Sequence, residues 1–205
     1  AFNRSNFQQE IFELYHDLIT FGTAAMFIEE DEEDFIKFST RHIDEVYIAE
    51  NDKGRIDTIY RRFNLSARAV VQKFGTAVSQ DILVLEKKDP YKEVEIVHAV
   101  YPRADFNPTK KDKKNMPFES VYMEYKNGNE LSVSGFKEFP FVVPRYLKAS
   151  HEIYGRSPAM TALPDVKMLN EMVKTTIKAA QKQVDPPLLV PDDGFLLPVR
   201  TVPGG

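Results

Sequence analysis

The side chains best suited to chemistry are scattered along this chain, and their spacing matches no familiar active-site motif. None of the histidines has a second ligand at the spacing of a metal-binding motif; they are His16, His42, His98 and His151. The chain has no cysteine, no Gly-x-Ser-x-Gly elbow and no Walker phosphate loop. We therefore expect no catalytic residues, no cofactor and no metal. The chain is interpreted as a non-enzyme, with an enzyme of unfamiliar site kept as an alternative.

Two charged runs could each bind an ion. Residues 29–34 are six consecutive acids, which suit either a hard cation or a solvated turn. The run lacks the glycine and the spacing of a calcium loop, and this favours the turn. Lysines surround Asp112 and could contact phosphate, although a mobile surface loop is the favoured interpretation; they are Lys110, Lys111, Lys113 and Lys114. The net charge of −4 argues against a general nucleic-acid-binding domain.

The third charged set lies on a long predicted helix, residues 158–184. Ser157 suits the N-cap, Pro158 suits the first helical position, and Pro164 is expected to bend the first turns. Residues 158–183 would span roughly 39 Å at about 1.5 Å per residue. At about 100° per residue, one face is apolar: Val166, Leu169, Met172, Val173, Thr176, Ile177, Ala180 and Val184.

The opposite face of this helix carries Lys167, Glu171, Lys174, Lys178 and Lys182. These lysines are either an ordinary solvated face or a face turned toward nucleic acid. The apolar face must be buried against another surface, and we expect packing on a second helix or on a neighbouring subunit.

The sequence patterns of helices and strands in the rest of the chain predict an α+β fold with antiparallel strands and an amphipathic N-terminal helix. The 205 residues, 42% hydrophobic and 28% charged, suffice for a buried core. We expect a mixed body at 1–150, the long-helix segment at 151–184 and an extended proline-rich end at 185–205. No run approaches about 18 apolar residues, so no membrane span is expected.

The periodicity of the body predicts its individual elements. The amphipathic helix covers 5–21 and ends at Gly22, and a short helix covers 66–74. Residues 79–88 suit a helix or a strand, and 139–146, with two prolines, suits an edge strand or an extended connector. Turn signals at 51–54 and 126–129 predict hairpins. Strands are expected at 24–28, 35–38, 45–49, 55–63, 94–101, 119–125 and 130–134.

Several segments together resemble the head-to-tail connecting (portal) proteins of short-tailed bacteriophages. The most specific are Phe141-Val142-Val143-Pro144-Arg145-Tyr146, Tyr154-Gly155-Arg156-Ser157-Pro158 and Leu163-Pro164-Asp165-Val166-Lys167-Met168-Leu169-Asn170. The opening helix with Gly22-Thr23-Ala24-Ala25-Met26-Phe27, the turn at Asp52-Lys53-Gly54-Arg55 and the run Asp185-Pro186-Pro187-Leu188-Leu189-Val190 are also similar. Residues 76–92 and 102–116 do not take part in the resemblance.

The resemblance implies a structural subunit of a ring, typically of twelve copies, at one vertex of the capsid. Double-stranded DNA passes without sequence reading through the central channel, the terminase packaging motor docks on the narrow end, and tail proteins replace it. Capsid or scaffolding proteins are further implied partners, no membrane is implied, and the location is the virion, with host cytoplasm during assembly.

In the family's plan, 1–150 is part of the wing, the long helix is the first stem helix, and 185–205 begins the clip. The chain opens on Ala1 and closes on Gly205 with no terminal element, so we expect the inner part of a longer protein. From the residues alone, the alternative is a soluble interaction module, or an uncharacterised enzyme, that dimerises through the long helix.

Overall fold

The computed structural model describes residues 5–31, 35–110, 112–184 and 186. The chain forms two compact units, Ala1–Met160 and Thr161–Gly205. Among the described residues, the first unit contains every strand and three of the α-helices, and the second consists mainly of α4. The extended end expected at 185–205 lies outside the described residues, apart from Pro186.

The α-helices begin and end at residues suited to those positions. A left-handed glycine, Gly22 with φ 80°, ends α1, and its N–H donates to the Leu18 carbonyl at 3.0 Å. Ser66 caps α2 by accepting a hydrogen bond from the Ala69 N–H at 3.4 Å. The helices are α1 (Phe7–Phe21), α2 (Ala67–Phe74), α3 (Gln80–Lys88) and α4 (Pro158–Val184), with short 3-10 turns η1 (Ile43–Glu45), η2 (Gly75–Ala77) and η3 (Lys113–Asn115).

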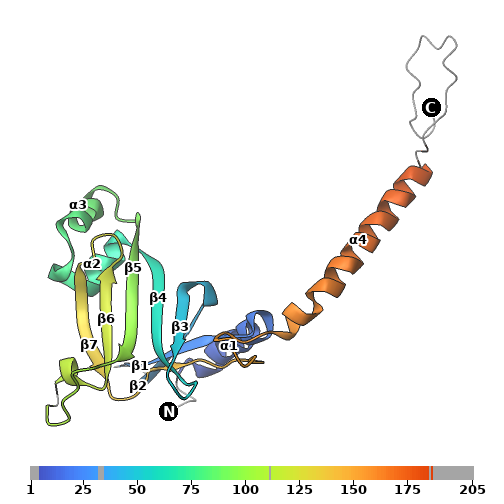
Figure 1. Cartoon of the computed structure of the whole chain (residues 1–205). Coiled ribbons are helices and arrows are strands. Elements are labelled where there is room, and N and C mark those ends of the chain that lie inside the picture. Colours follow the sequence, from blue (N-terminus) through green and yellow to red (C-terminus); the bar gives the residue numbers. More distant parts are fainter. Residues whose placement is uncertain (1–4, 32–34, 111, 185, 187–205) are drawn as a thin grey trace. The chain divides into compact units, whose positions relative to one another are not determined.

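Two antiparallel sheets form the body (Figure 1). The smaller sheet has the order β2-β1-β8, built from β1 (Ala25–Asp31), β2 (Phe35–Arg41) and β8 (Phe141–Val142). The larger has the order β3-β4-β5-β6-β7, in which every strand pairs with its neighbour in sequence. Its strands are β3 (Val46–Glu50), β4 (Ile56–Ser66), β5 (Glu93–Pro102), β6 (Phe118–Glu124) and β7 (Glu130–Phe136).

Alternation along the strands of the larger sheet divides its residues between a packed face and an open face. On β4, Ile59 and Phe63 are buried, whereas Tyr60 and Arg62 are exposed. The larger sheet contributes Val46, Ile48, Ile59 and Val100 to a core shared with Ala25, Phe27 and Phe141 of the smaller sheet. This first core therefore joins the two sheets.

Two further cores hold the helices to the sheets. Val70 of α2 and Ile82 of α3 pack in the second core with Phe63 and Ile96 of the larger sheet. Leu14 of α1 packs in the third core with Ala24, Met26 and Phe38. The apolar face predicted for α1 is thus the buried one.

The α+β fold with antiparallel strands is confirmed, and the structure resolves both ambiguous segments. In 79–88, Gln80–Lys88 forms α3, because Ile82 and Leu85 reach the second core at helical spacing. Within 139–146, two residues form β8 at the edge of the smaller sheet, between Pro140 and Pro144. Proline on either side of so short a strand fits an edge position.

One expectation was wrong for part of the acidic run. Glu29, Glu30 and Asp31 are the end of β1 and not a turn, because the β1–β2 ladder continues to the pair Asp31 and Phe35. Opposite charges across the ladder support this register, since Lys37 Nζ lies 4.0 Å from a Glu29 carboxylate oxygen. Residues 32–34 lie outside the described residues. Within the described part of the chain, no three acids or histidines are grouped to hold a metal.

Candidate assembly surfaces

The long helix presents an apolar row that is exposed along its length. The predicted helix is confirmed as α4, whose 27 residues span about 40 Å at about 1.5 Å per residue. The exposed fractions of the large side chains in this row run from 49% for Val166 to 59% for Leu169. The row comprises Val166, Leu169, Met172, Val173, Ile177 and Ala180. Aliphatic side chains aligned on one face of a helix indicate a surface that another protein surface covers.

The opposite face of α4 carries the predicted lysines, all exposed. Lys174 Nζ lies 3.0 Å from a Glu171 carboxylate oxygen, one turn earlier. Within the described residues, Lys167, Lys178 and Lys182 have no acidic partner at ion-pair distance. Three of the four lysines are therefore available to an external anion.

Ser157 fastens the start of α4 to the body. Its hydroxyl oxygen accepts from the Met160 N–H at 2.9 Å, and the hydroxyl donates to the Thr20 carbonyl of α1 at 2.8 Å. Ser157 is 1% exposed. The predicted N-cap is therefore also a bridge between the end of α1 and the first turn of α4.

Two glycines let the chain cross itself beside this cap. Tyr146 N–H donates to the Gly22 carbonyl at 2.9 Å, and Gly155 N–H donates to the Thr23 hydroxyl at 2.7 Å. A Cβ on Gly155 would lie 2.3 Å from the Gly22 carbonyl oxygen, and one on Gly22 would lie 2.5 Å from the Gly155 oxygen. Only glycine fits either side of this crossing.

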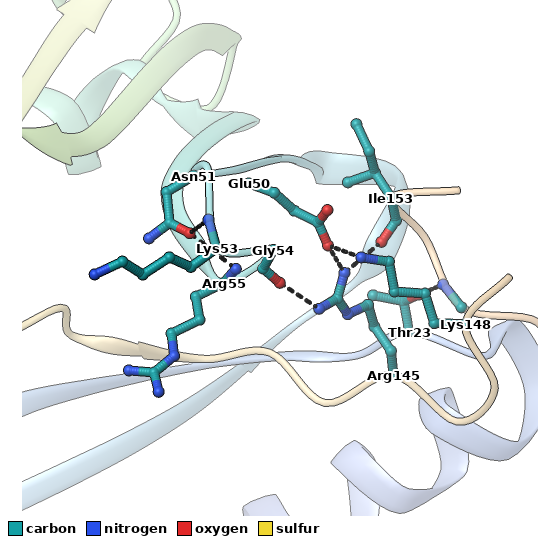
Figure 2. Close-up of polar contacts among 10 residues, drawn as sticks. Thr23, Glu50, Asn51, Lys53, Gly54, Arg55, Arg145, Lys148 and Ile153 are labelled. Carbon is teal, nitrogen blue, oxygen red and sulfur yellow. Dashed lines mark hydrogen bonds and ion pairs between the residues drawn. The ribbon is translucent and has the colours of Figure 1, made fainter. Parts of the chain in front are cut away.

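Arg145 joins the connector before α4 to the turn between β3 and β4. Figure 2 shows its guanidinium between Glu50, the Gly54 carbonyl and the Ile153 carbonyl. It pairs with Glu50 and donates to the Ile153 carbonyl at 3.0 Å and to the Gly54 carbonyl at 3.2 Å. Lys148 also pairs with Glu50, at 2.5 Å. Hydrogen bonds from Lys148 and then Arg145 lower the pKa of the Glu50 carboxyl.

Tyr154 adds a second tie between the connector and the larger sheet. Its hydroxyl accepts from the Ile48 N–H at 3.2 Å and lies 3.4 Å from the Val46 carbonyl, both on β3. Arg145 of the segment 141–146, and Tyr154 and Gly155 of the segment 154–158, thus all hold the connector to the body. The sequence reasoning singled out these segments but did not predict their contacts or the role of Glu50.

The remaining polar groups singled out in the sequence do not come together. His98 is buried, His42 lies 2.5 Å from Asp44, His16 lies 3.8 Å from Asp17, and His151 is exposed. In the basic tract, Lys110 is exposed and Lys113 begins η3, whereas Lys111 lies outside the described residues. No helix in the described part of the chain is both long and apolar enough to cross a bilayer.

The chain is similar to two curated bacteriophage proteins. The chain is 35% identical over 209 residues to a protein named "Portal protein" from Salmonella phage epsilon15. It is 33% identical over 208 residues to one named "Probable portal protein" from Bordetella phage BPP-1. Each alignment covers 100% of this chain and 38% of the relative, so the chain spans well under half of the relatives' length. The family model described as "Bacteriophage head to tail connecting protein" matches residues 1–205, and the chain therefore belongs to this family.

Proposed function

We propose that this chain is part of a portal ring subunit that encloses a channel for double-stranded DNA at the capsid vertex. In this proposal 1–150 is the wing, the helix in 151–184 is a strut in the ring wall, and 185–205 begins the clip. The observation that carries it is the exposed apolar row of α4, in a chain of the head-to-tail connecting family. Packing of this row on a second stem helix or on a neighbouring subunit removes it from water.

The lysine face of α4 suits loose contact with passing DNA. Each phosphate neutralised by a lysine adds to affinity, so a channel lined by many cations would hold the duplex in place. Here Lys167, Lys174, Lys178 and Lys182 stand in a chain of net charge −4. Such contacts are to phosphates alone, so the channel takes DNA of any sequence.

The proposed partners follow from the same role. The terminase packaging motor docks on the narrow end during filling, tail proteins bind there afterwards, and capsid or scaffolding proteins contact the rim. The subunit works structurally, not as an enzyme, in the virion and in host cytoplasm during assembly. Support comes from the curated relatives, whose names describe portal proteins.

Imaging of the full-length protein tests the proposal. Negative-stain electron microscopy is expected to show rings with a central hole, typically of twelve copies. Discrete dimers would instead support the alternative of an interaction module, or an enzyme, that pairs through α4. In either case the apolar row is buried, so it is the shape of the particle that decides.

Replacement of the lysine face tests the DNA channel separately from the ring. The variant Lys167→Gln/Lys174→Gln/Lys178→Gln/Lys182→Gln keeps helix-forming side chains and removes four charges. Rings are expected to form normally, while the amount of DNA packaged or retained per particle falls severalfold. Normal packaging by this variant would assign the lysines to an ordinary solvated face.

A further inference from the structure

A polar row separates the first and second cores on the packed face of the larger sheet. Arg61, His98 and Tyr122 lie opposite one another across β4, β5 and β6. The His98 and Tyr122 rings stack at 3.9 Å with an angle of 3° between them. His98 is 2% exposed, and its Nε2 lies 2.9 Å from the Ser120 hydroxyl oxygen. The row thus presents a rigid, buried aromatic base with a cation at one end.

Cations from three elements meet at this row. Lys73 of α2 lies over the Tyr122 ring, with its Nζ 4.6 Å from the ring centre. Arg61 of β4 has a side chain only 13% exposed, and its guanidinium lies 3.7 Å above the Phe63 ring. Arg41 of β2 is the ladder partner of Ala25, which belongs to the first core together with Val46, and Val46 is the ladder partner of Arg61. We call Arg41, Arg61 and Lys73 the basic cluster.

The electrostatics of His98 agree with this placement. Burial lowers the pKa of His98 to about 3, and the positive charges of Lys73, Arg61 and Arg41 shift it in the same direction. Burial also lowers the pKa of Arg61, and the charge of Arg41 adds to that effect. All three cations therefore act on one small region.

The acids near the basic cluster do not balance it. Glu45 binds Arg61 at 2.8 Å, and Glu29 lies 4.0 Å from Lys37. In the described part of the chain, neither Arg41 nor Lys73 has an acidic partner within ion-pair distance. Of the described residues named here, four are cations (Lys37, Arg41, Arg61 and Lys73) and two are carboxylates, which is an excess of two positive charges. Uncompensated like charges destabilise a fold unless an anion joins them.

We propose that the basic cluster binds a phosphate group that carries two negative charges, either free phosphate or a terminal phosphate monoester. Two guanidinium groups can each donate a pair of hydrogen bonds to phosphate oxygens, and Lys73 adds a mobile ammonium at the exposed side. A phosphate monoester carries about two negative charges at neutral pH, which matches the excess. The internal phosphates of a DNA strand carry one charge each and match it less well.

Calorimetry with inorganic phosphate tests this site in the full-length protein, with chloride adjusted to keep the ionic strength constant. Wild type is expected to show saturable binding, which Arg41→Gln/Lys73→Gln weakens at least tenfold. The matched control is Lys53→Gln/Arg55→Gln, which removes two exposed cations that point away from Arg145 (Figure 2). Binding by the control is expected to stay within twofold of wild type. No saturable binding, or equal weakening in both variants, would overturn the proposal.

Further measurements identify the ligand and check that a variant still folds. Because Lys73 is an exposed residue, the single variant Lys73→Gln is expected to fold as wild type by circular dichroism and still weaken phosphate binding severalfold. Succinate in place of phosphate tests for an acidic protein segment, and binding of succinate alone would overturn the phosphate assignment. Tighter binding of a 5′-phosphorylated duplex than of its unphosphorylated form would assign the phosphate to a DNA end, and equal binding would assign it to the free anion.

Discussion

Single residues decide whether the connector can cross the end of α1. Gly155 is the clearest case, because a Cβ there would lie 2.3 Å from the Gly22 carbonyl oxygen and 3.1 Å from the Tyr146 backbone nitrogen. The cap at Ser157 and the Arg145–Glu50 pair lie within a few residues of this crossing. A substitution at this crossing would therefore disturb the start of α4 as well as the body.

Gly155→Ala is therefore expected to lower the free energy of unfolding by about 2–4 kcal/mol, because a buried methyl group forces the two backbones apart. Urea denaturation of wild type and variant measures the difference. Gly128→Asn is the control, since Gly128 has a positive φ of 65° but nothing within 4 Å, and asparagine tolerates that conformation. A loss no larger for Gly155→Ala than for the control would contradict the tight crossing.

The buried histidine makes a second prediction, about pH. His98 has a pKa of about 3 in the folded chain and 6.5 as its ordinary value. Between these values the unfolded chain binds a proton that the folded chain does not, so stability falls as the pH is lowered from 6.5 toward 3. The expected slope is at most about 1.4 kcal/mol per pH unit, or about 2 kcal/mol between pH 6.5 and pH 5.

The variant His98→Phe/Ser120→Ala removes this slope, because phenylalanine has no group that titrates. It keeps an aromatic ring on Tyr122 and leaves no hydroxyl without its partner. Urea denaturation of wild type and variant at pH 7.5 and pH 5 gives the comparison. The stability difference between the two proteins is expected to shift by about 2 kcal/mol in favour of the variant at pH 5. An unchanged difference would mean that His98 takes up its proton in the folded state.

At the scale of elements, α4 has two faces with different expected roles. Leu169 and Ile177 lie two turns apart in the exposed apolar row. In the variant Leu169→Gln/Ile177→Gln, glutamine preserves the helix but replaces two aliphatic side chains. Each of these aliphatic side chains contributes about 1.5–3 kcal/mol when fully buried. Size-exclusion chromatography with light scattering is expected to show loss of the assembled particle.

The control variant for this face is Lys167→Gln/Lys178→Gln, which changes the opposite side of the same helix. It is expected to assemble as wild type does. If both variants assemble as wild type does, the apolar row is not part of the interface. If neither variant assembles, assembly depends on α4 as a whole and not on one of its faces.

Local sequence signals sufficed for most elements of this chain. The N-cap at Ser157, the left-handed stop at Gly22 and the hairpin turns at 51–54 and 126–129 act over a few residues, so the sequence alone predicts them. The strand character of Glu29 to Asp31 depends on pairing with β2, which no local propensity reveals. The choice of helix for 79–88 depends likewise on the second core.

Of the candidate surfaces, too, only the part that depends on local sequence could be predicted. Helical periodicity was enough to find both faces of α4. Arg145 meets Glu50 across 95 residues of sequence, and Lys73 meets Tyr122 through α2 packing, so spacing gives no signal for either contact. A pairing signal in aligned homologous sequences is what could have found them.

At the scale of the whole molecule, the proposed ring requires a neighbouring surface that covers the apolar row of α4. The chain covers 38% of the length of its portal relatives, and the apolar row is exposed within it. Contacts between two different surfaces of neighbouring subunits give a ring when the rotation between subunits closes, and an open filament when it does not.

The most direct test is the mass of the assembled full-length protein, measured by native mass spectrometry at near-physiological salt. A portal ring is expected to give one dominant closed species with many copies, typically twelve, and a marked shift to monomers in Leu169→Gln/Ile177→Gln. A wild-type mass equal to one or two subunits, unchanged in that variant, would contradict it.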